Sequence, residues 1–267
     1  MPARRAIIAG SGRLPRLIAR QARPALVVRF RGVAVDLPPG VAHFEAEFER
    51  LGAMFAALAA AGVEEVVMAG AMHRPAFDPA RLDRETAALL PGLQAAMSAG
   101  DDGLLRHVIG LFEARGLTVR SALEVAPELC LPPGTLWGRA PEAAALADEA
   151  RARAVLQALA PLDVGQAAVA EAGMVLGIET LQGTGFLLES VARSPAALRR
   201  GRGVLVKEPK AGQDMRVDVP TIGPDTVVGV AAAGLAGIAI AAGGVIVLEQ
   251  EEVAALIRRH DLFLVAR

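Results

Sequence analysis

The chain has 267 residues, of which 53% are hydrophobic and 21% charged, and its formal net charge is −1. This balanced charge gives no general attraction for nucleic acid, and one Trp with no Tyr leaves little material for a base-stacking surface. The single cysteine, Cys130, excludes an internal disulfide and a cysteine-based metal knuckle.

The apolar runs of the chain do not predict a membrane span. The run before Gly10 is only a few residues long, which is too short for a signal peptide. The longest run, residues 227–246, is interrupted by glycines and follows a polar loop. It is better explained by the body of a helix followed by two short strands around a turn. We therefore expect a cytoplasmic protein that does not cross a membrane.

Residues 4–12, RRAIIAGSG, predict a short strand that runs into a glycine turn, and LPRLIARQAR after it has helical spacing. Strand, Gly-x-Gly and helix is how a nucleotide-binding βαβ unit begins. The third fingerprint glycine is missing, and the next strand, ALVVRF, leads to arginines instead of an acidic residue for a ribose. We therefore expect Gly10, Ser11 and Gly12 to bind a phosphate with their backbone amides. A tight turn without a ligand is the alternative.

Strands and helices continue to alternate up to residue 120. Helices are predicted at 48–62, 81–99 and 101–116, and EEVVMAG and LTVR predict buried strands. His73 and Arg74 follow the first of these strands, at the end where open α/β sheets bind ligands. The alternation predicts an α/β fold with an N-terminal, Rossmann-like, doubly wound parallel sheet in residues 1–130.

A proline- and glycine-rich stretch, PELCLPPGTLWGRAP, interrupts this alternation. We expect a linker at residues 131–141 and a second α/β domain with a mixed sheet at 142–267. This domain is predicted to hold a helix at 142–159 and a hairpin in AAVAEAGMVLGIE. Gln166 lies at the entry of the hairpin, Glu179 at its end, and Thr184 in a Gly-Thr-Gly turn that could bind an anion.

The polar stretch at residues 207–226, KEPKAGQDMRVDVPTIGPDT, holds charged residues of both signs close together. It lies between a predicted strand and a predicted helix, where α/β proteins keep much of their chemistry. Its cations are Lys207, Lys210 and Arg216, and its aspartates are Asp214, Asp218 and Asp225. Together they could hold a divalent metal and a phosphate. A solvated loop with surface ion pairs, in which Asp225 only caps a helix, is the alternative.

Several motifs resemble one enzyme family. They are DVGQ at 163–166, IE with GT within 178–184, and K..K.GQD.R.DVPTIGP.T at 207–226, with IIAGSGRLP and MAGAMHRP nearer the N-terminus. The chain is similar along nearly its whole length to the UDP-2,3-diacylglucosamine pyrophosphatases of the I type, which act in lipid A biosynthesis. One departure is Gly185, where we expect many relatives to carry Asp.

The resemblance implies a hydrolase of two domains that releases UMP and 2,3-diacylglucosamine 1-phosphate (lipid X) from UDP-2,3-diacylglucosamine. It also implies a divalent cation, Mg²⁺ or another such as Mn²⁺, and attack of water on the β-phosphorus. The acylated substrate implies a transient contact with the inner-membrane surface from the cytoplasmic side. No nucleic-acid partner is expected, and a homodimer stays open.

The expected site residues fall into three groups. The catalytic group is Asp225, Asp214, Lys207, Lys210 and Arg216, and the metal group is Asp214, Asp218 and Asp225. The substrate-binding group is Gly10, Ser11, Gly12, His73, Arg74, Gln166, Glu179, Thr184, Gln213 and Thr226. Spacing alone does not decide which carboxylates touch metal and which one orients water. Two other functions stay open, an NAD-binding oxidoreductase and a non-catalytic binder of nucleotide sugars.

Overall fold

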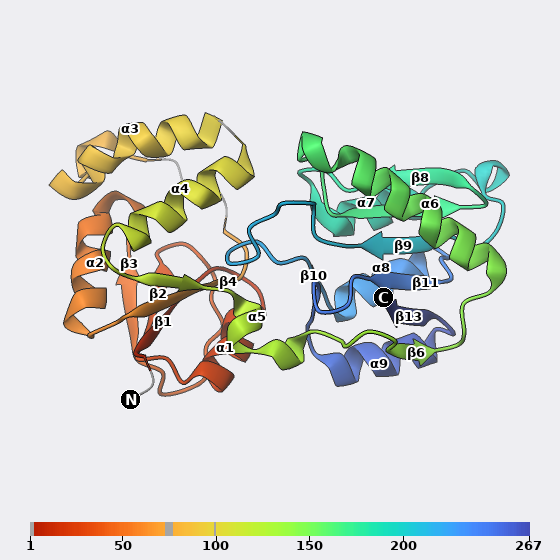
Figure 1. Cartoon of the computed structure of the whole chain (residues 1–267), viewed down its shortest axis with the longest axis horizontal. Coiled ribbons are helices and arrows are strands. Elements are labelled where there is room, and N and C mark those ends of the chain that lie inside the picture. The colour runs from red at the N-terminus through yellow and green to blue at the C-terminus, as the bar shows by residue number, and fades with distance from the viewer. Residues whose placement is uncertain (1–2, 73–76, 99) are drawn as a thin grey trace. The chain divides into compact units, whose positions relative to one another are not determined.

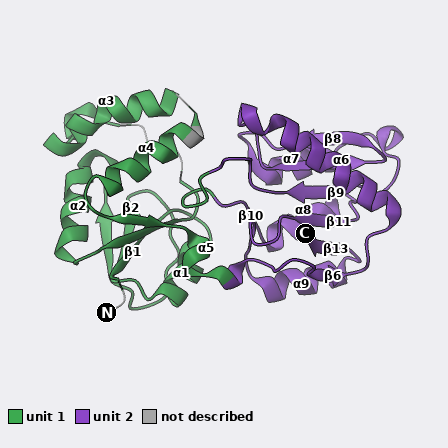
Figure 2. Ribbon diagram, viewed as in Figure 1, with its two compact units in different colours: residues 1–127, 214–218 green, residues 128–213, 219–267 purple. Residues whose placement is uncertain are grey.

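The computed structural model describes residues 3–72, 77–98 and 100–267, and of residues 101 and 102 the backbone only. The chain divides into two compact units (Figure 2). Unit 1 holds residues 1–127 and 214–218, and unit 2 holds residues 128–213 and 219–267.

Unit 1 is built on a five-stranded sheet in the order β3-β2-β1-β4-β5, in which every pair is parallel (Figure 1). Its strands are β1 (Arg5–Ala9), β2 (Leu26–Phe30), β3 (His43–Ala46), β4 (Glu65–Ala69) and β5 (Thr118–Arg120). Its helices are α1 (Leu14–Ala22), α2 (Leu51–Ala60), α3 (Arg84–Ser98), α4 (Asp101–Glu113) and α5 (Ala122–Val125). The strand order is that of a Rossmann fold, and it confirms the predicted doubly wound parallel sheet.

Helices pack on both faces of this sheet because its strands are apolar on both sides. α1 packs on β1 and β4 with α5 beside it, while α2 packs against β3, and α4 against β5 and α3. The strands contribute buried residues such as Ile8, Val28 and Val66 to a core that Leu58 and Phe112 complete from the helices. Near-continuous apolar strands of this kind are typical of a parallel sheet covered on both faces.

Unit 2 is built on a six-stranded mixed sheet in the order β6-β13-β11-β9-β7-β8 (Figure 1). Its strands are β6 (Leu136–Gly138), β7 (Ala167–Glu171), β8 (Met174–Ile178), β9 (Val204–Lys207), β11 (Gly237–Ile240) and β13 (Phe263–Ala266), with the separate pair β10 (Thr221–Ile222) and β12 (Ile246–Val247). Its helices are α6 (Ala143–Leu159), α7 (Gly183–Ala192), α8 (Pro224–Ala232) and α9 (Gln250–Arg259). The mixed sheet and the hairpin β7–β8 were both predicted and are confirmed.

Two apolar clusters cover the two faces of this sheet. Ala145, Ala152 and Leu156 of α6 pack on one face, over residues such as Val204 and Phe263. Helices α7, α8 and α9 pack on the other face through a second buried cluster. The expected pair of strands after α8 exists, but β11 joins the large sheet and β12 pairs with β10.

The limits of the two units differ from the linear domains expected from sequence. The division falls between Pro127 and Glu128, and the proline-rich residues 131–141 belong to unit 2. Leu131 lies in its core, and β6 pairs with β13 inside this stretch. Prolines and glycines therefore mark an edge strand and its turns here, and not a free linker. Among the described residues, no helix is long and apolar enough to span a membrane.

Residues 214–218 return to unit 1, although the rest of the polar stretch is in unit 2 (Figure 2). Ser121 donates a hydrogen bond to the carbonyl of Met215 at 2.5 Å, and Val217 packs against the unit 1 core. Arg216 forms an ion pair with Glu113 of α4 at 2.8 Å. These three contacts attach the segment to unit 1.

Candidate active site

Four of the predicted site residues meet in unit 2 and form one hydrogen-bonded group, the Lys207 cluster, made of Gln166, Glu179, Thr184 and Lys207. Lys207 Nζ donates to Thr184 Oγ1 at 2.6 Å and lies 3.4 Å from Glu179 Oε1. Thr184 Oγ1 donates to Glu179 Oε1 at 2.5 Å, and the Gln166 amide donates to Glu179 Oε2 at 3.0 Å. Glu179 and Lys207 are both buried, so the ammonium is paired and its direction is set by two oxygens.

The sheet directions explain why these distant residues meet. Strand β7 is antiparallel to both β8 and β9, with Ala167 opposite Lys207 and Ala168 opposite Ile178. The carboxyl ends of β8 and β9 therefore lie at the same edge as the start of β7. We call this the carboxyl edge of the unit 2 sheet. Ligands of open α/β sheets bind outside such an edge.

Gly165 of the DVGQ motif allows the chain to approach Glu179 closely. A Cβ at position 165 would lie 2.1 Å from the Glu179 carbonyl oxygen, which no side chain can tolerate. The Glu179 amide also donates to the Ala167 carbonyl at 2.7 Å. Close packing therefore requires a glycine at position 165, and this packing brings the Gln166 amide within hydrogen-bonding distance of the Glu179 carboxylate.

Lys210 is held by a second set of contacts in unit 2. Its amide donates to Gln213 Oε1 at 2.8 Å, and its ammonium forms a short ion pair with Asp163. Asp163, the first residue of DVGQ, was not predicted as a site residue. Its place in the same motif as Gln166 was the signal that could have indicated it.

Asp225 and Thr226 lie in the first turn of α8, after Gly223. Thr226 Oγ1 accepts a hydrogen bond from the Gly223 amide at 3.3 Å. The Asp225 side chain is exposed, and within the part of the chain that the structure describes it makes no hydrogen bond or ion pair. It is thus not the side chain that caps this helix, and its carboxylate oxygens are available to a ligand.

Asp214 and Arg216 form a local ion pair in unit 1. Arg216 donates to Asp214 from its backbone amide at 3.0 Å and from Nη2 at 2.6 Å. The guanidinium holds the pKa of Asp214 below its usual range, even though partial burial works in the opposite direction. The same pairing raises the pKa of Arg216. The Asp214 oxygens are thus already engaged by a cation.

The three carboxylates expected to bind metal are divided between the two units. Asp214 and Asp218 belong to unit 1 and Asp225 to unit 2. In residues 3–72, 77–98 and 100–267, no three His, Cys, Asp or Glu side chains are placed to hold one ion. Mg²⁺ is often bound through one or two carboxylates together with substrate phosphates and water, and the exposed Asp225 fits that pattern.

The glycine turn after β1 serves a different purpose from the one expected. The Gly10 amide donates to the Ala69 carbonyl at 2.8 Å, and the Ser11 amide donates to the Ala71 carbonyl at 2.7 Å. The expectation of a phosphate nest from these two amides is therefore corrected, because both are used within the protein. Gly12 lies next in the same turn with a φ of 94°. His73 and Arg74 lie outside the described residues.

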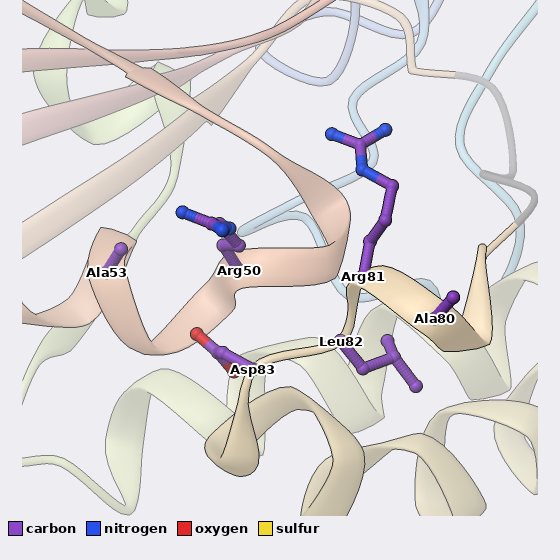
Figure 3. A pocket seen from close by; sticks show the side chains of 6 residues that line it. All are labelled: Arg50, Ala53, Ala80, Arg81, Leu82 and Asp83. Atoms are coloured by element: carbon purple, nitrogen blue, oxygen red, sulfur yellow. The ribbon is translucent and has the colours of Figure 1, made fainter.

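A pocket of about 480 Å³ lies elsewhere in unit 1 (Figure 3). It is lined by Arg50, Ala53, Ala80, Arg81, Leu82 and Asp83. Asp83 accepts hydrogen bonds from the amides of Gly52 at 3.1 Å and Thr86 at 2.6 Å, and it thereby joins α2 to α3. The pocket contains none of the predicted site residues.

A partly buried ion pair next to the Lys207 cluster was also missed by the sequence reasoning. Arg153 of α6 contacts Glu208 at 2.5 Å, and the Glu208 amide donates to the Gln166 carbonyl at 3.0 Å. Burial raises the pKa of Glu208, and the charge of Arg153 opposes that shift. Glu208 directly follows Lys207 in the sequence, and this adjacency was the signal that could have indicated it. Its partner, Arg153, lies on a helix far away in the sequence and could not be identified from the local pattern.

Comparisons with known proteins show which family the chain belongs to. The model of the LpxI N-terminal domain matches residues 4–129, and that of the LpxI C-terminal domain matches residues 132–265. UDP-2,3-diacylglucosamine pyrophosphatase LpxI of Caulobacter vibrioides is 39% identical over 269 residues, which cover 97% of this chain and 95% of that protein. These matches confirm the resemblance based on the sequence motifs, and the chain belongs to the LpxI family.

Proposed function

We propose that the chain hydrolyses the pyrophosphate of UDP-2,3-diacylglucosamine and releases UMP and 2,3-diacylglucosamine 1-phosphate. The observation that carries the proposal is the Lys207 cluster at the carboxyl edge of the unit 2 sheet. The name of the Caulobacter relative, similar over nearly the full length of both chains, supports the same substrate.

Pyrophosphate cleavage depends more on neutralising charge than on covalent help from the protein. Lys207 is the cation best prepared for this, because Glu179 and Thr184 hold its ammonium in one direction. Both Glu179 oxygens are engaged within the protein. We therefore give Glu179 a positioning role and assign the contact with a phosphate oxygen to Lys207.

Asp225 is the carboxylate that we assign to the reaction. It is exposed, and no side chain of the described residues neutralises it. Its neighbour Thr226 closes the turn before α8 and fixes the backbone there. Asp225 can accept a proton from the attacking water or serve as a ligand for a divalent cation.

The proposal includes a divalent cation, Mg²⁺ or Mn²⁺, held by Asp225 together with the substrate phosphates. When bound, it would neutralise the charge of the pyrophosphate. Lys210 is a further cation for the same purpose and is kept in place by Asp163 and Gln213. Asp214 and Arg216 form an ion pair within unit 1, and we assign them a structural role, which is to hold the polar stretch in place.

The proposed reaction is the attack of water on the β-phosphorus. The new bond joins the water oxygen to that phosphorus, the bond from it to the bridging oxygen breaks, and UMP leaves with the bridging oxygen. A transient contact with the inner-membrane surface belongs to the proposal because the substrate carries two acyl chains.

The decisive experiment is an assay for UMP release from UDP-2,3-diacylglucosamine with Mg²⁺, with Mn²⁺ and with a chelator. Release that requires the cation is the expected result, and in ¹⁸O-labelled water the label should enter the lipid product and not UMP. Tight binding of the substrate without release under any metal would instead identify a nucleotide-sugar binder.

A further inference from the structure

Three large apolar side chains of unit 2 are exposed close to predicted site residues, and we call them the apolar rim. They are Leu181, Phe186 and Val228, which are 90%, 55% and 49% exposed. Each follows a site residue by two or three positions: Leu181 follows Glu179, Phe186 follows Thr184, and Val228 follows Asp225. Exposed apolar residues are common singly, but these three lie within three positions of Glu179, Thr184 and Asp225.

The segments that carry the apolar rim are neighbours in the fold. Leu181 lies in the loop between β8 and α7, Phe186 lies in α7, and Val228 lies in α8. Helix α7 packs against α8, and a Cβ at Gly229 would lie 2.9 Å from Leu188 Cδ1, so the two helices approach closely beside Val228. The buried residues of these helices, such as Leu188 and Val227, supply the core contacts. The rim is therefore not needed for the fold of unit 2.

We propose that the apolar rim is the surface by which the protein contacts a lipid bilayer. The inference rests on the proposed function, since a substrate with two acyl chains keeps its pyrophosphate near the lipid headgroups. A site for that group has to be brought to the bilayer surface. Apolar side chains around the site bury themselves at the boundary between headgroups and acyl chains, which gives reversible attachment.

The exposure of the apolar rim also favours contact with a lipid bilayer over a groove that binds one acyl chain of the substrate. Leu181 is 90% exposed in the loop between β8 and α7, so almost none of its side chain is covered by the protein. Membrane insertion needs side chains that project in this way.

The test is co-sedimentation of the full chain with vesicles of phosphatidylethanolamine and phosphatidylglycerol, without substrate. In the double variant Leu181→Ser/Phe186→Ser we expect vesicle binding to fall about tenfold or more, because binding no longer transfers two large apolar side chains from water into the bilayer. Met174→Ser is the matched control. Met174 is 66% exposed at the other end of β8, on the order of 13 Å of strand away from Ile178.

Parent-like binding by the double variant, an equal loss in Met174→Ser, or no vesicle binding by the parent chain would each overturn the proposal. Fluorescence of Trp137 checks that the double variant is folded. The result is independent of the proposed reaction, because binding is measured without turnover. UMP release from a water-soluble short-acyl substrate, measured separately, should be unchanged in the double variant if the proposed function is right.

Discussion

Lys207 Nζ lies 3.4 Å from Glu179 Oε1, and the two side chains are only 8% and 11% exposed. The pair joins the end of β9 to the end of β8. In a buried pair of this kind, hydrogen bonds and the opposite charge offset the cost of desolvation. Removal of one partner therefore leaves a buried charge without compensation.

We expect Lys207→Met to lower the unfolding free energy of unit 2 by about 3 kcal/mol, the usual cost of breaking a buried ion pair. Lys210→Met is the control, because its partner Asp163 is 39% exposed and such pairs contribute at most about 1 kcal/mol. Urea unfolding followed by Trp137, the single Trp of the chain, measures both variants. Equal losses would mean that the Lys207 cluster is no more stabilising than a surface pair.

Asp225→Asn should lower the rate of UMP release by about two orders of magnitude or more, as expected for loss of a general base or key electrostatic group. The stability of the protein should change by less than about 1 kcal/mol, because only a favourable helix-terminus charge is removed.

Glu251→Gln is the control for Asp225. Glu251 is also exposed and occupies the second position of its helix, α9, as Asp225 does in α8. Normal turnover in folded Asp225→Asn protein at saturating Mg²⁺ would show that Asp225 acts only on the helix.

Gly10→Ala should destabilise unit 1 by about 1–3 kcal/mol, the usual range for overpacking. Its Cβ would lie 2.4 Å from the Ala71 carbonyl oxygen and 2.7 Å from the Gly70 carbonyl carbon, and both are backbone atoms that cannot rotate away. Gly110→Ala in α4 is the control and should stabilise by about 0.5–1 kcal/mol, since a Cβ there meets nothing within 4 Å. Calorimetry measures both variants, since unit 1 has no Trp.

Acid should remove the contribution of Asp83 to the stability of unit 1. Burial works to raise its pKa, but hydrogen bonds from Thr86 and from the amides of Gly52 and Ala53 outweigh burial and lower it. The stabilisation is therefore complete above the unfolded pKa near about 3.9 and is lost as the pH falls through the lower folded pKa. The calorimetric difference between the parent and Asp83→Asn should shrink between about pH 5 and pH 2. A difference that stays constant over this range would contradict the assignment.

Local patterns were enough to predict several parts of the molecule. The alternation of apolar strands and amphipathic helices predicted the parallel sheet of unit 1 and the hairpin β7–β8. The motifs around Gln166, Glu179 and Lys207 predicted the family, because each is a short stretch of residues with a fixed spacing. Whether the predicted metal ligands and catalytic residues act as expected stays a prediction.

Other features depended on contacts between residues far apart in the sequence. The amides of Gly10 and Ser11 looked available in the chain, but the carbonyls of Ala69, at the end of β4, and of Ala71 after it accept their hydrogen bonds. The polar stretch looked continuous, but Ser121 and Glu113 attach its middle to unit 1. Neither partner could be identified from the sequence near these residues.

The sequence by itself determined which residue types stand at the ends of the strands, and with them the fold class and the family. Only the tertiary structure decided that Gln166, Glu179, Thr184 and Lys207 form one group while Asp225 stays exposed. The physical reason is that periodicity reports the local environment of each segment. Which strand ends share an edge is set by the pairing of β7 with both β8 and β9, over separations that no local pattern encodes.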